Sequence, residues 1–385
     1  MRMIQAESTL AYKDPDHACN QGSLIQLANG ELLLGFNQER SRLHADSGQS
    51  CLIRSTDGGR SWDPATKKVV WPYTDYDGNW DCAFAQTSDG TIIMHTRLCS
   101  FMAPTALRRG DEQALQGGRA GGLERLKRQT GYAVFKSTDN GHSWNGPRPV
   151  NTYPIAAAGE GPYACGTSGA GHVVELADGD LLMPLEGTIS PAGIEATDGP
   201  TGETSRCFVL RSDDGGDNWE HWATIAYDPA SIINFQEPTV VRLREGRLIC
   251  IMRVLYRPPR YDNLWFAYSE DDGATWSPPR RTNIWGYPAD VIQLQDGRVL
   301  AVYSYRRQPM GVRGCLSDDG LHWDVANEFV IRDCVLAPLE DPFYWHIGYP
   351  TVAQTPDGAI VVAYHEYSED DVPVQYMRTS RFRLD

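Results

Sequence analysis

The sequence predicts an all-β fold, a six-bladed β-propeller with four-stranded antiparallel blades, and two repeated patterns support that prediction. The first pattern is an apolar run, a turn of Asn-Gly, Asp-Gly or Glu-Gly, and a second apolar run, which is typical of a β-hairpin. It occurs six times, with turn glycines at Gly30, Gly90, Gly179, Gly246, Gly297 and Gly358. The second pattern, S-x-D-x-G-x-x-W, follows these hairpins. Six similar units in one chain predict six blades.

The S-x-D-x-G-x-x-W pattern predicts a second hairpin turn in most units. Asp and Gly favour a tight turn, and the Ser and Trp side chains can anchor that turn to its own blade. We interpret the pattern as a folding device, because turns of this kind seldom carry chemistry. Four intact copies occupy residues 55–62, 137–144, 212–219 and 269–276, and a copy one residue shorter occupies residues 317–323.

The whole chain, residues 1–385, is predicted to form a single domain, since its 41% hydrophobic residues suffice for one large core. The sixth unit has no S-x-D motif and ends with residues 374–384, which resemble a third strand without a fourth. Residues 3–12 can supply that fourth strand. We therefore expect the N-terminal strand to close the last blade, which would remove two exposed sheet edges.

A long gap between the second and third turn glycines indicates an insertion at about residues 99–130, in the loop after the second strand of blade two. Two interpretations stay open. The insertion is a basic lid or a subunit contact through which the chain forms a homo-oligomer, or it is a solvated, partly helical surface loop.

The formal net charge of −15 disfavours binding to nucleic acid and to an anionic membrane surface. The N-terminal residues lack an apolar run like that of a signal peptide, so we predict a cytoplasmic protein, although a secreted chain whose signal peptide had been removed would look the same. Nine cysteines, scattered and without a C-x-x-C pair, favour a reducing compartment. We predict no metal, because His17, His44, His172 and His346 lack metal-ligand spacing, and no cofactor.

The number of residues that separates a position from the turn glycine of its hairpin predicts which residues share one face of the propeller. If the turn glycines lie at one face, the starts of the inner strands and the ends of the second strands meet at the other, where active sites belong. Counting back nine residues from each glycine gives the inner-strand starts Gln21, Asp81, Ala170, Glu237, Pro288 and Tyr349. The second-strand ends add Arg97, Glu186, Arg253, Arg306, Arg307, His365 and Glu366, and Asp46 lies in the first upper loop. These residues surround one opening of the central channel, which we call the mouth. Arginines, carboxylates and a tyrosine at the mouth predict an anion-binding hydrolytic site.

The S-x-D-x-G-x-x-W copies resemble the Asp-boxes, or BNR repeats, of the sialidase (neuraminidase) superfamily, and the resemblance extends along nearly the whole chain. It implies a loop Asp as acid/base, a Tyr nucleophile assisted by a Glu, and three Arg that hold the substrate carboxylate. By that resemblance the acid/base is Asp46, the nucleophile is Tyr349, its base is Glu237, and the arginines include Arg253 and either Arg306 or Arg307.

One departure concerns the first arginine of the family, which belongs to an Arg-Ile-Pro signature in blade one. This chain has Asn20, Gln21 and Gly22 there. Arg97, or an arginine near Arg40 and Arg42, could substitute for it. The simpler inference is a substrate other than ordinary sialic acid, such as a uronic, ulosonic or neutral sugar. We include Asn20, Asp81 and Arg97 among the predicted substrate contacts.

The predicted function is an exo-acting glycoside hydrolase that releases a terminal acidic sugar with retention. A neutral tyrosine can attack an anomeric carbon that bears a carboxylate, where a carboxylate nucleophile would be repelled. Two other functions stay open: a polysaccharide lyase or inverting glycosidase at the same mouth, and a non-catalytic glycan-binding propeller. At the residue level, Tyr349 could be a packing residue, Glu237 and Arg253 a structural ion pair, and Arg306, Arg307 and Arg313 solubilising surface arginines.

Overall fold

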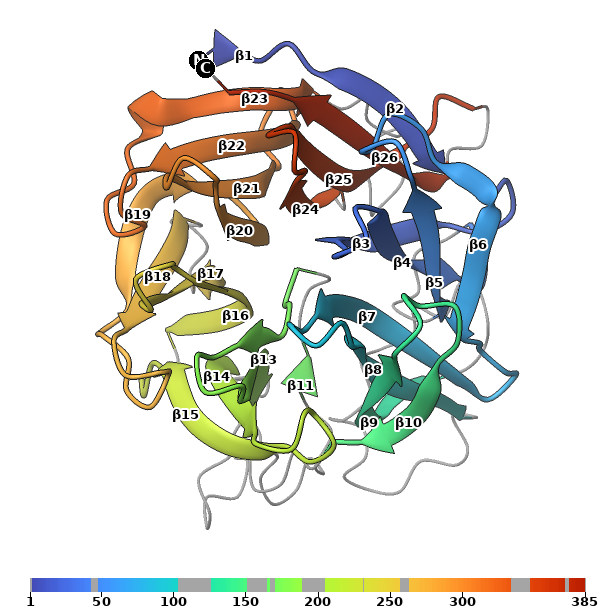
Figure 1. Cartoon of the computed structure of the whole chain (residues 1–385), viewed down its shortest axis with the longest axis horizontal. Helices are drawn as coiled ribbons and strands as arrows, with labels where there is room; N and C mark the ends of the chain where they lie inside the picture. The colour runs from blue at the N-terminus through green and yellow to red at the C-terminus, as the bar shows by residue number, and fades with distance from the viewer. Residues whose placement is uncertain are drawn as a thin grey trace.

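A computed structural model describes residues 2–42, 48–102, 126–150, 165–166, 170–188, 205–230, 232–256, 263–333, 347–370 and 374–384. Its strands are grouped in sheets around a central axis (Figure 1). In these ranges the one helical element is a 3-10 turn, η3 (Val325–Asn327). The predicted all-β propeller is therefore confirmed. Asp46 and most of the insertion predicted at 99–130 lie outside the described residues.

Strand pairing divides the described chain into six blades. The pairings form five sheets, the largest of which joins two blades through one bridge between Gly48 and Asn79. Blade one contains β3 (Cys19–Gln26), β4 (Leu32–Glu39), β5 (Gly48–Ser55) and β6 (Asp63–Trp71). Blade two contains β7 (Asp77–Gln86), β8 (Ile92–Met102), β9 (Leu126–Ser137) and β10 (Asn145–Pro149). Blade three contains the short inner strands β11 (Cys165–Gly166) and β12 (Val174–Glu175), then β13 (Leu181–Thr188), β14 (Ser205–Ser212) and β15 (Glu220–Ala226).

The remaining blades follow the same antiparallel order from the axis outward. Blade four contains β16 (Ile233–Arg242), β17 (Leu248–Tyr256), β18 (Asn263–Ser269) and β19 (Arg280–Trp285). Blade five contains β20 (Ala289–Gln293), β21 (Val299–Tyr305), β22 (Gly311–Ser317) and β23 (Glu328–Asp333). Blade six contains β24 (Gly348–Gln354), β25 (Ile360–Tyr367) and β26 (Gln375–Phe382), with β2 (Glu7–Tyr12) outermost.

The two ends of the chain meet in blade six, as predicted. Strand β2 pairs antiparallel with β26, beginning with Glu7 opposite Arg381. A two-residue strand that was not predicted, β1 (Arg2–Met3), pairs in parallel with β23 of blade five. In the view of Figure 1 both ends of the chain lie at the rim. The pairing of β2 with β26 covers the outer edge of β26.

The six predicted hairpin turns form at the six glycines. All six have positive φ, from +80° at Gly358 to +101° at Gly246, a backbone conformation that side chains with a Cβ rarely adopt. In the first S-x-D motif, Ser55 Oγ accepts a hydrogen bond from the Gly59 N–H and donates one to Asp57. These contacts are internal to the turn, as expected of a folding device.

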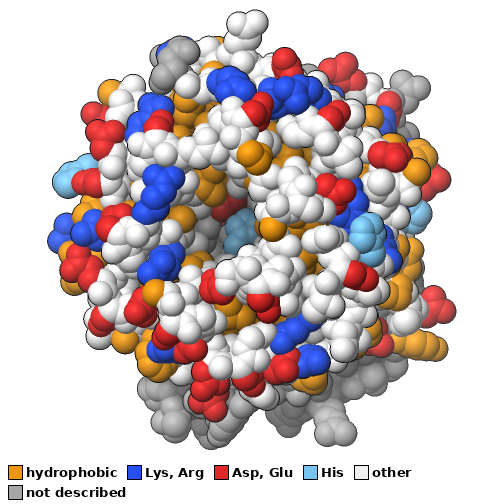
Figure 2. Space-filling view, viewed as in Figure 1, with side chains coloured by type: hydrophobic (Ala, Val, Ile, Leu, Met, Phe, Trp, Pro, Cys, Tyr) orange, Lys and Arg blue, Asp and Glu red, His pale blue; other side chains and the backbone are white. Residues whose placement is uncertain are grey.

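A buried carboxylate at the axis ties several inner strands together. Asp290 on β20 is fully buried and accepts hydrogen bonds from the Val352 N–H at 2.8 Å and from the Thr351 hydroxyl at 3.0 Å. His172 Nε2 lies 3.4 Å from the same carboxylate, and His172 Nδ1 lies 2.6 Å from the Phe84 carbonyl oxygen of blade two. The centre of the propeller is hollow, with acidic and histidine side chains inside it (Figure 2). This network holds together the inner strands whose first residues line the mouth.

Candidate active site

Four residues at the mouth have a left-handed backbone. The φ angles are +52° at Gln21, +58° at Asp81, +48° at Glu237 and +45° at Tyr349. All four are inner-strand starts found by counting back nine residues, and each lies where the pairing register of its hairpin shifts. Such bulges re-aim a side chain, and a left-handed residue with a Cβ costs about 1–3 kcal/mol. Strain of this kind gathers at functional sites.

The main-chain N–H of three of these residues is bound by a side chain of the preceding blade. Glu186 Oε2 accepts from the Glu237 N–H at 2.7 Å, and Ser304 Oγ accepts from the Tyr349 N–H at 2.7 Å. His365 Nδ1 accepts from the Gln21 N–H at 3.4 Å. These three acceptors all lie seven residues after a turn glycine. In these three cases a side chain of one blade therefore holds the main chain of a mouth residue in the next blade.

Arginines occupy the same position in two other blades and bind a carboxylate of their own blade. Arg97 pairs with Asp81 in blade two, and Arg253 Nη1 donates to Glu237 Oε2 at 2.9 Å in blade four. The Tyr349 hydroxyl donates to Glu237 Oε1 at 2.9 Å, so three of the residues named by the family resemblance, Tyr349, Glu237 and Arg253, lie in contact. Arg253 Nη1 also lies 3.5 Å from the Tyr349 hydroxyl.

The structure separates Arg306 from Arg307. The Arg306 guanidinium is buried and lies 5.2 Å from the centre of the Tyr349 ring. Arg307 is exposed and stacks on Trp285 at 4.1 Å. Arg313 is buried inside blade five, where it pairs with Asp333. Arg306 is therefore the arginine that accompanies Arg253 beside Tyr349.

Tyr287, between β19 and β20, supports both of these arginines. The guanidinium carbons of Arg253 and Arg306 lie 4.8 and 4.6 Å from the centre of its ring. Cation–π contacts of this kind hold guanidinium groups in place when they are shielded from water. The sequence interpretation missed Tyr287, although it directly precedes Pro288, one of the six inner-strand starts. Ser304 was also missed, and Glu186 was placed at the mouth without a role.

The protonation state of Tyr349 is that of a neutral hydroxyl. Burial and the adjacent Glu237 carboxylate raise the pKa of Tyr349 to about 12. Burial alone would lower the pKa of Arg253, but the adjacent Glu237 carboxylate raises it, so Arg253 stays charged. Burial and the charge of Glu237 raise the pKa of Glu186 to about 7. Tyr349 thus stays protonated at neutral pH unless a base takes its proton, and Glu237 already accepts its hydrogen bond.

On the blade-one side, the position of the family's first arginine is filled by a buried amide. Asn20 is fully buried, and its Nδ2 donates to Glu39 at 3.1 Å and to Gln375 at 2.7 Å. The predicted substitutes have protein partners too, because Arg97 is paired with Asp81 and Arg42 Nη2 lies 3.3 Å from an Asp16 carboxylate oxygen. Substrate contact by Asn20, Asp81 or Arg97 stays a prediction.

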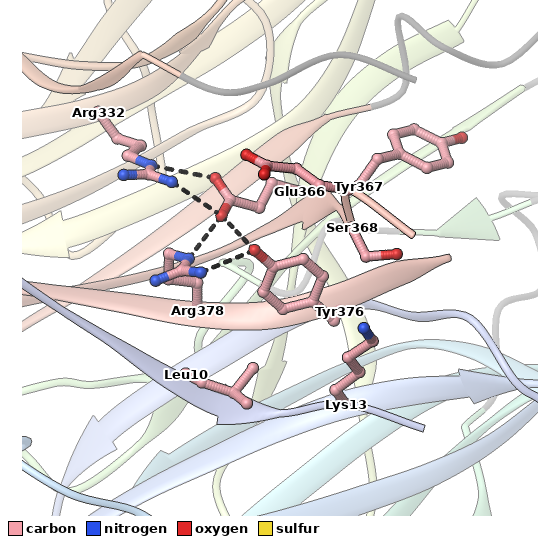
Figure 3. A pocket seen from close by; sticks show the side chains of 9 residues that line it. Leu10, Lys13, Arg332, Glu366, Tyr367, Ser368, Tyr376 and Arg378 are labelled. Carbon is pink, nitrogen blue, oxygen red and sulfur yellow. Dashed lines mark hydrogen bonds and ion pairs between the residues drawn. The ribbon is translucent and has the colours of Figure 1, made fainter. Parts of the chain in front are cut away.

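A separate pocket of about 310 Å³ is lined by residues of blade six and by Arg332 of blade five. The buried Glu366 carboxylate pairs there with Arg332 and Arg378 and accepts from the Tyr376 hydroxyl (Figure 3). Adjacent strand residues point to opposite sides. His365 therefore stacks on Tyr349 at 5.7 Å while Glu366 lines this pocket.

The described residues contain neither a membrane-spanning helix nor a cluster of metal-binding side chains. None of the helical segments in the described ranges is long and apolar enough to cross a membrane. Nor does the described part of the chain contain a group of three or more His, Cys, Asp or Glu side chains that could hold a metal ion.

Comparison with known proteins agrees with the fold and with the resemblance noted in the sequence. The model of the family described as BNR repeat-like domain matches residues 116–362, more than half of the chain. Comparison with curated proteins finds no match.

Solved structures share the fold at low sequence identity. A protein of unknown function from Dyadobacter fermentans has a TM-score of 0.79 and 22% identity, with 100% of both chains covered. The intramolecular trans-sialidase of Ruminococcus gnavus has a TM-score of 0.67 and 14% identity, covering 95% of this chain and 94% of that one. The α-L-arabinanase of Penicillium chrysogenum has a TM-score of 0.55 and 15% identity, covering 98% and 96%. The chain therefore has the propeller fold found in sialidases and in an arabinanase.

Proposed function

We propose that this chain, which belongs to the family of BNR repeat-like domains, is an exo-acting glycoside hydrolase. We further propose that its reaction retains the configuration of the anomeric carbon. The observation that carries the proposal is the hydrogen bond from the Tyr349 hydroxyl to Glu237, with two guanidinium groups beside it. A buried tyrosine paired with a carboxylate is a nucleophile with its base.

In the first step the Tyr349 oxygen attacks the anomeric carbon, and its proton passes to Glu237. The bond from that carbon to the leaving oxygen breaks, and the leaving oxygen takes a proton from an acid, for which the sequence favours Asp46. In the second step water attacks the same carbon and gives a proton to Asp46. The bond from that carbon to the Tyr349 oxygen breaks as the bond to water forms, and Tyr349 recovers its proton from Glu237.

The substrate is a terminal acidic sugar of the sialic, ulosonic or uronic type. Arg253 and Arg306 both lie close to Tyr349, and guanidinium groups bind carboxylates through paired hydrogen bonds. Asn20 replaces the first arginine of the sialidase set, so two arginines rather than three would bind the acid group. This difference favours a sugar other than ordinary sialic acid.

A panel of aryl glycosides of sialic, ulosonic, uronic and neutral sugars tests the proposal. Release of the aryl group is expected with at least one acidic sugar, and proton NMR should show a first-formed product with the anomeric configuration of the substrate. An inverted product would overturn the tyrosine mechanism, and an unsaturated product that absorbs ultraviolet light would indicate a lyase.

The second candidate function is glycan binding without catalysis, and Asn20 in place of the arginine is the observation that favours it. No turnover of any glycoside, together with saturable binding of acidic glycans by calorimetry, would support this function and exclude the hydrolase.

A further inference from the structure

Glu186, at the end of β13 in blade three, contacts the main chain of the proposed base. Its Oε2 accepts from the Glu237 N–H at 2.7 Å, across the boundary between blades three and four. The bulge at Glu237 shifts the strand pairing between Gln236 and Thr239, so the ladder register is broken at this residue. A buried N–H without an acceptor is unfavourable, and the Glu186 carboxyl supplies one. The left-handed conformation of Glu237, φ +48°, thus depends on a side chain from another blade.

The proposed nucleophile is held in the same way. Ser304, at the corresponding position of blade five, accepts from the Tyr349 N–H at 2.7 Å, and Tyr349 has φ +45°. Both partners of the Tyr349–Glu237 hydrogen bond are therefore fixed by the blade that precedes them. Glu186 differs from Ser304 because it can ionise.

Charged groups surround Glu186 from three other elements. Glu237 on β16 repels a negative charge on Glu186, whereas Arg97 on β8 and Arg253 on β17 attract it. Cys207, its pairing partner on β14, is a buried thiol whose pKa is raised by burial. Burial of Glu186 and repulsion by Glu237 together raise the pKa of Glu186 to about 7.

We propose that Glu186 is a positioning residue for the Glu237–Tyr349 pair and that its protonated form is the one competent in the proposed reaction, on which this inference rests. The protonated carboxyl holds the Glu237 main chain without placing a second negative charge beside the Glu237 carboxylate. Ionisation of Glu186 adds that charge, which repels an acidic substrate from the mouth.

Two substitutions separate the hydrogen bond from the charge. Glu186→Gln keeps an oxygen acceptor and cannot ionise, so kcat/KM below pH 6 should stay within about threefold of wild type, while the loss of kcat/KM above pH 7 should move to higher pH. Glu186→Ala removes the acceptor, so kcat should fall about tenfold or more at every pH, the equivalent of one lost hydrogen bond. Glu220→Gln, the same chemical change at an exposed residue of blade three, is the matched control and should leave the profile unchanged.

Crystal structures of the same variants test the inference without any substrate. In Glu186→Gln, residue 237 should keep its left-handed φ and its bond to Tyr349, whereas in Glu186→Ala one or both should be lost. A Glu186→Ala structure that keeps both would overturn the inference even if the protein is a hydrolase, and so would a Glu186→Gln pH profile identical to wild type. Absence of glycosidase activity in the wild type would instead refute the proposed function and leave the structural result standing.

Discussion

Replacing Tyr349 with phenylalanine separates catalysis from stability. The change removes one hydroxyl, which donates to Glu237 at 2.9 Å, and keeps the ring that contacts Arg306 and His365. Glu237 retains its ion pair with Arg253, so no carboxylate is left buried without a partner. The cost should therefore be that of one hydrogen bond to a charged group, about 1.5–2 kcal/mol.

For a chain of this length the entropy of unfolding is about 0.8 kcal/mol per kelvin, so the Tm of Tyr349→Phe should fall by about 2 °C. Activity should fall far more, by about 10³-fold or more, because the atom that forms the covalent bond is missing. Differential scanning calorimetry and the initial rate on the best aryl glycoside of the panel measure the two effects.

Tyr303→Phe is the matched control for this experiment. Tyr303 is fully buried in blade five, and its hydroxyl also donates to a glutamate, Glu328. It should lose a similar amount of stability and keep its activity. The assignment of Tyr349 as nucleophile would be refuted if Tyr349→Phe retained more than about a tenth of wild-type activity, or if both variants lost activity equally.

Three further predictions concern the arginines and the axis. Arg306→Ala should raise KM for an acidic glycoside about tenfold or more, whereas Arg307→Ala should change it less than about twofold; equal effects in steady-state kinetics would contradict the assignment. Tyr287→Leu should raise KM about threefold to tenfold with little change in Tm, because the ring that supports two guanidinium groups is lost; an unchanged KM would show that the ring plays no part. Asp290→Asn should destabilise the fold by about 3 kcal/mol, as expected when a buried ion pair loses one partner. Burial lowers the pKa of His172, but the Asp290 charge outweighs it and raises that pKa, so the pair stabilises the native state below pH 6.5 and loses this contribution as pH rises through the raised pKa. Denaturant unfolding of wild type and Asp290→Asn at several pH values measures this, and a difference in unfolding free energy that does not shrink above pH 6.5 would refute it.

Counting residues from the hairpin turns predicted many of the residues at the mouth, because strand pairing sets the distance from a turn to the end of its strand. Glu237 and Tyr349 were both found by counting back nine residues from a glycine, and the structure places them in contact. The same count identified Gln21 and Asp81, and all four have a left-handed backbone that the count could not foresee. Asp46 stays a prediction, since it lies outside the described residues.

Choices between adjacent residues could not be made from the sequence. Arg306 and Arg307 are chemically identical, and one is buried beside Tyr349 while the other lies exposed on Trp285. The direction of a side chain at a strand end depends on local backbone angles and on what the next blade offers. The bond from Glu186 to Glu237 also joins two blades, so no pattern within one repeat could reveal it.

The sequence by itself determined the propeller, its number of repeats, its closure by the N-terminal strand and the ring of residues at the mouth, because these follow from local hairpin geometry repeated along one chain. Only the tertiary structure decided which members of that ring touch. Contacts such as Tyr349 with Glu237, and Glu186 with the Glu237 main chain, join segments 112 and 51 residues apart and exist only once the blades pack around a common axis.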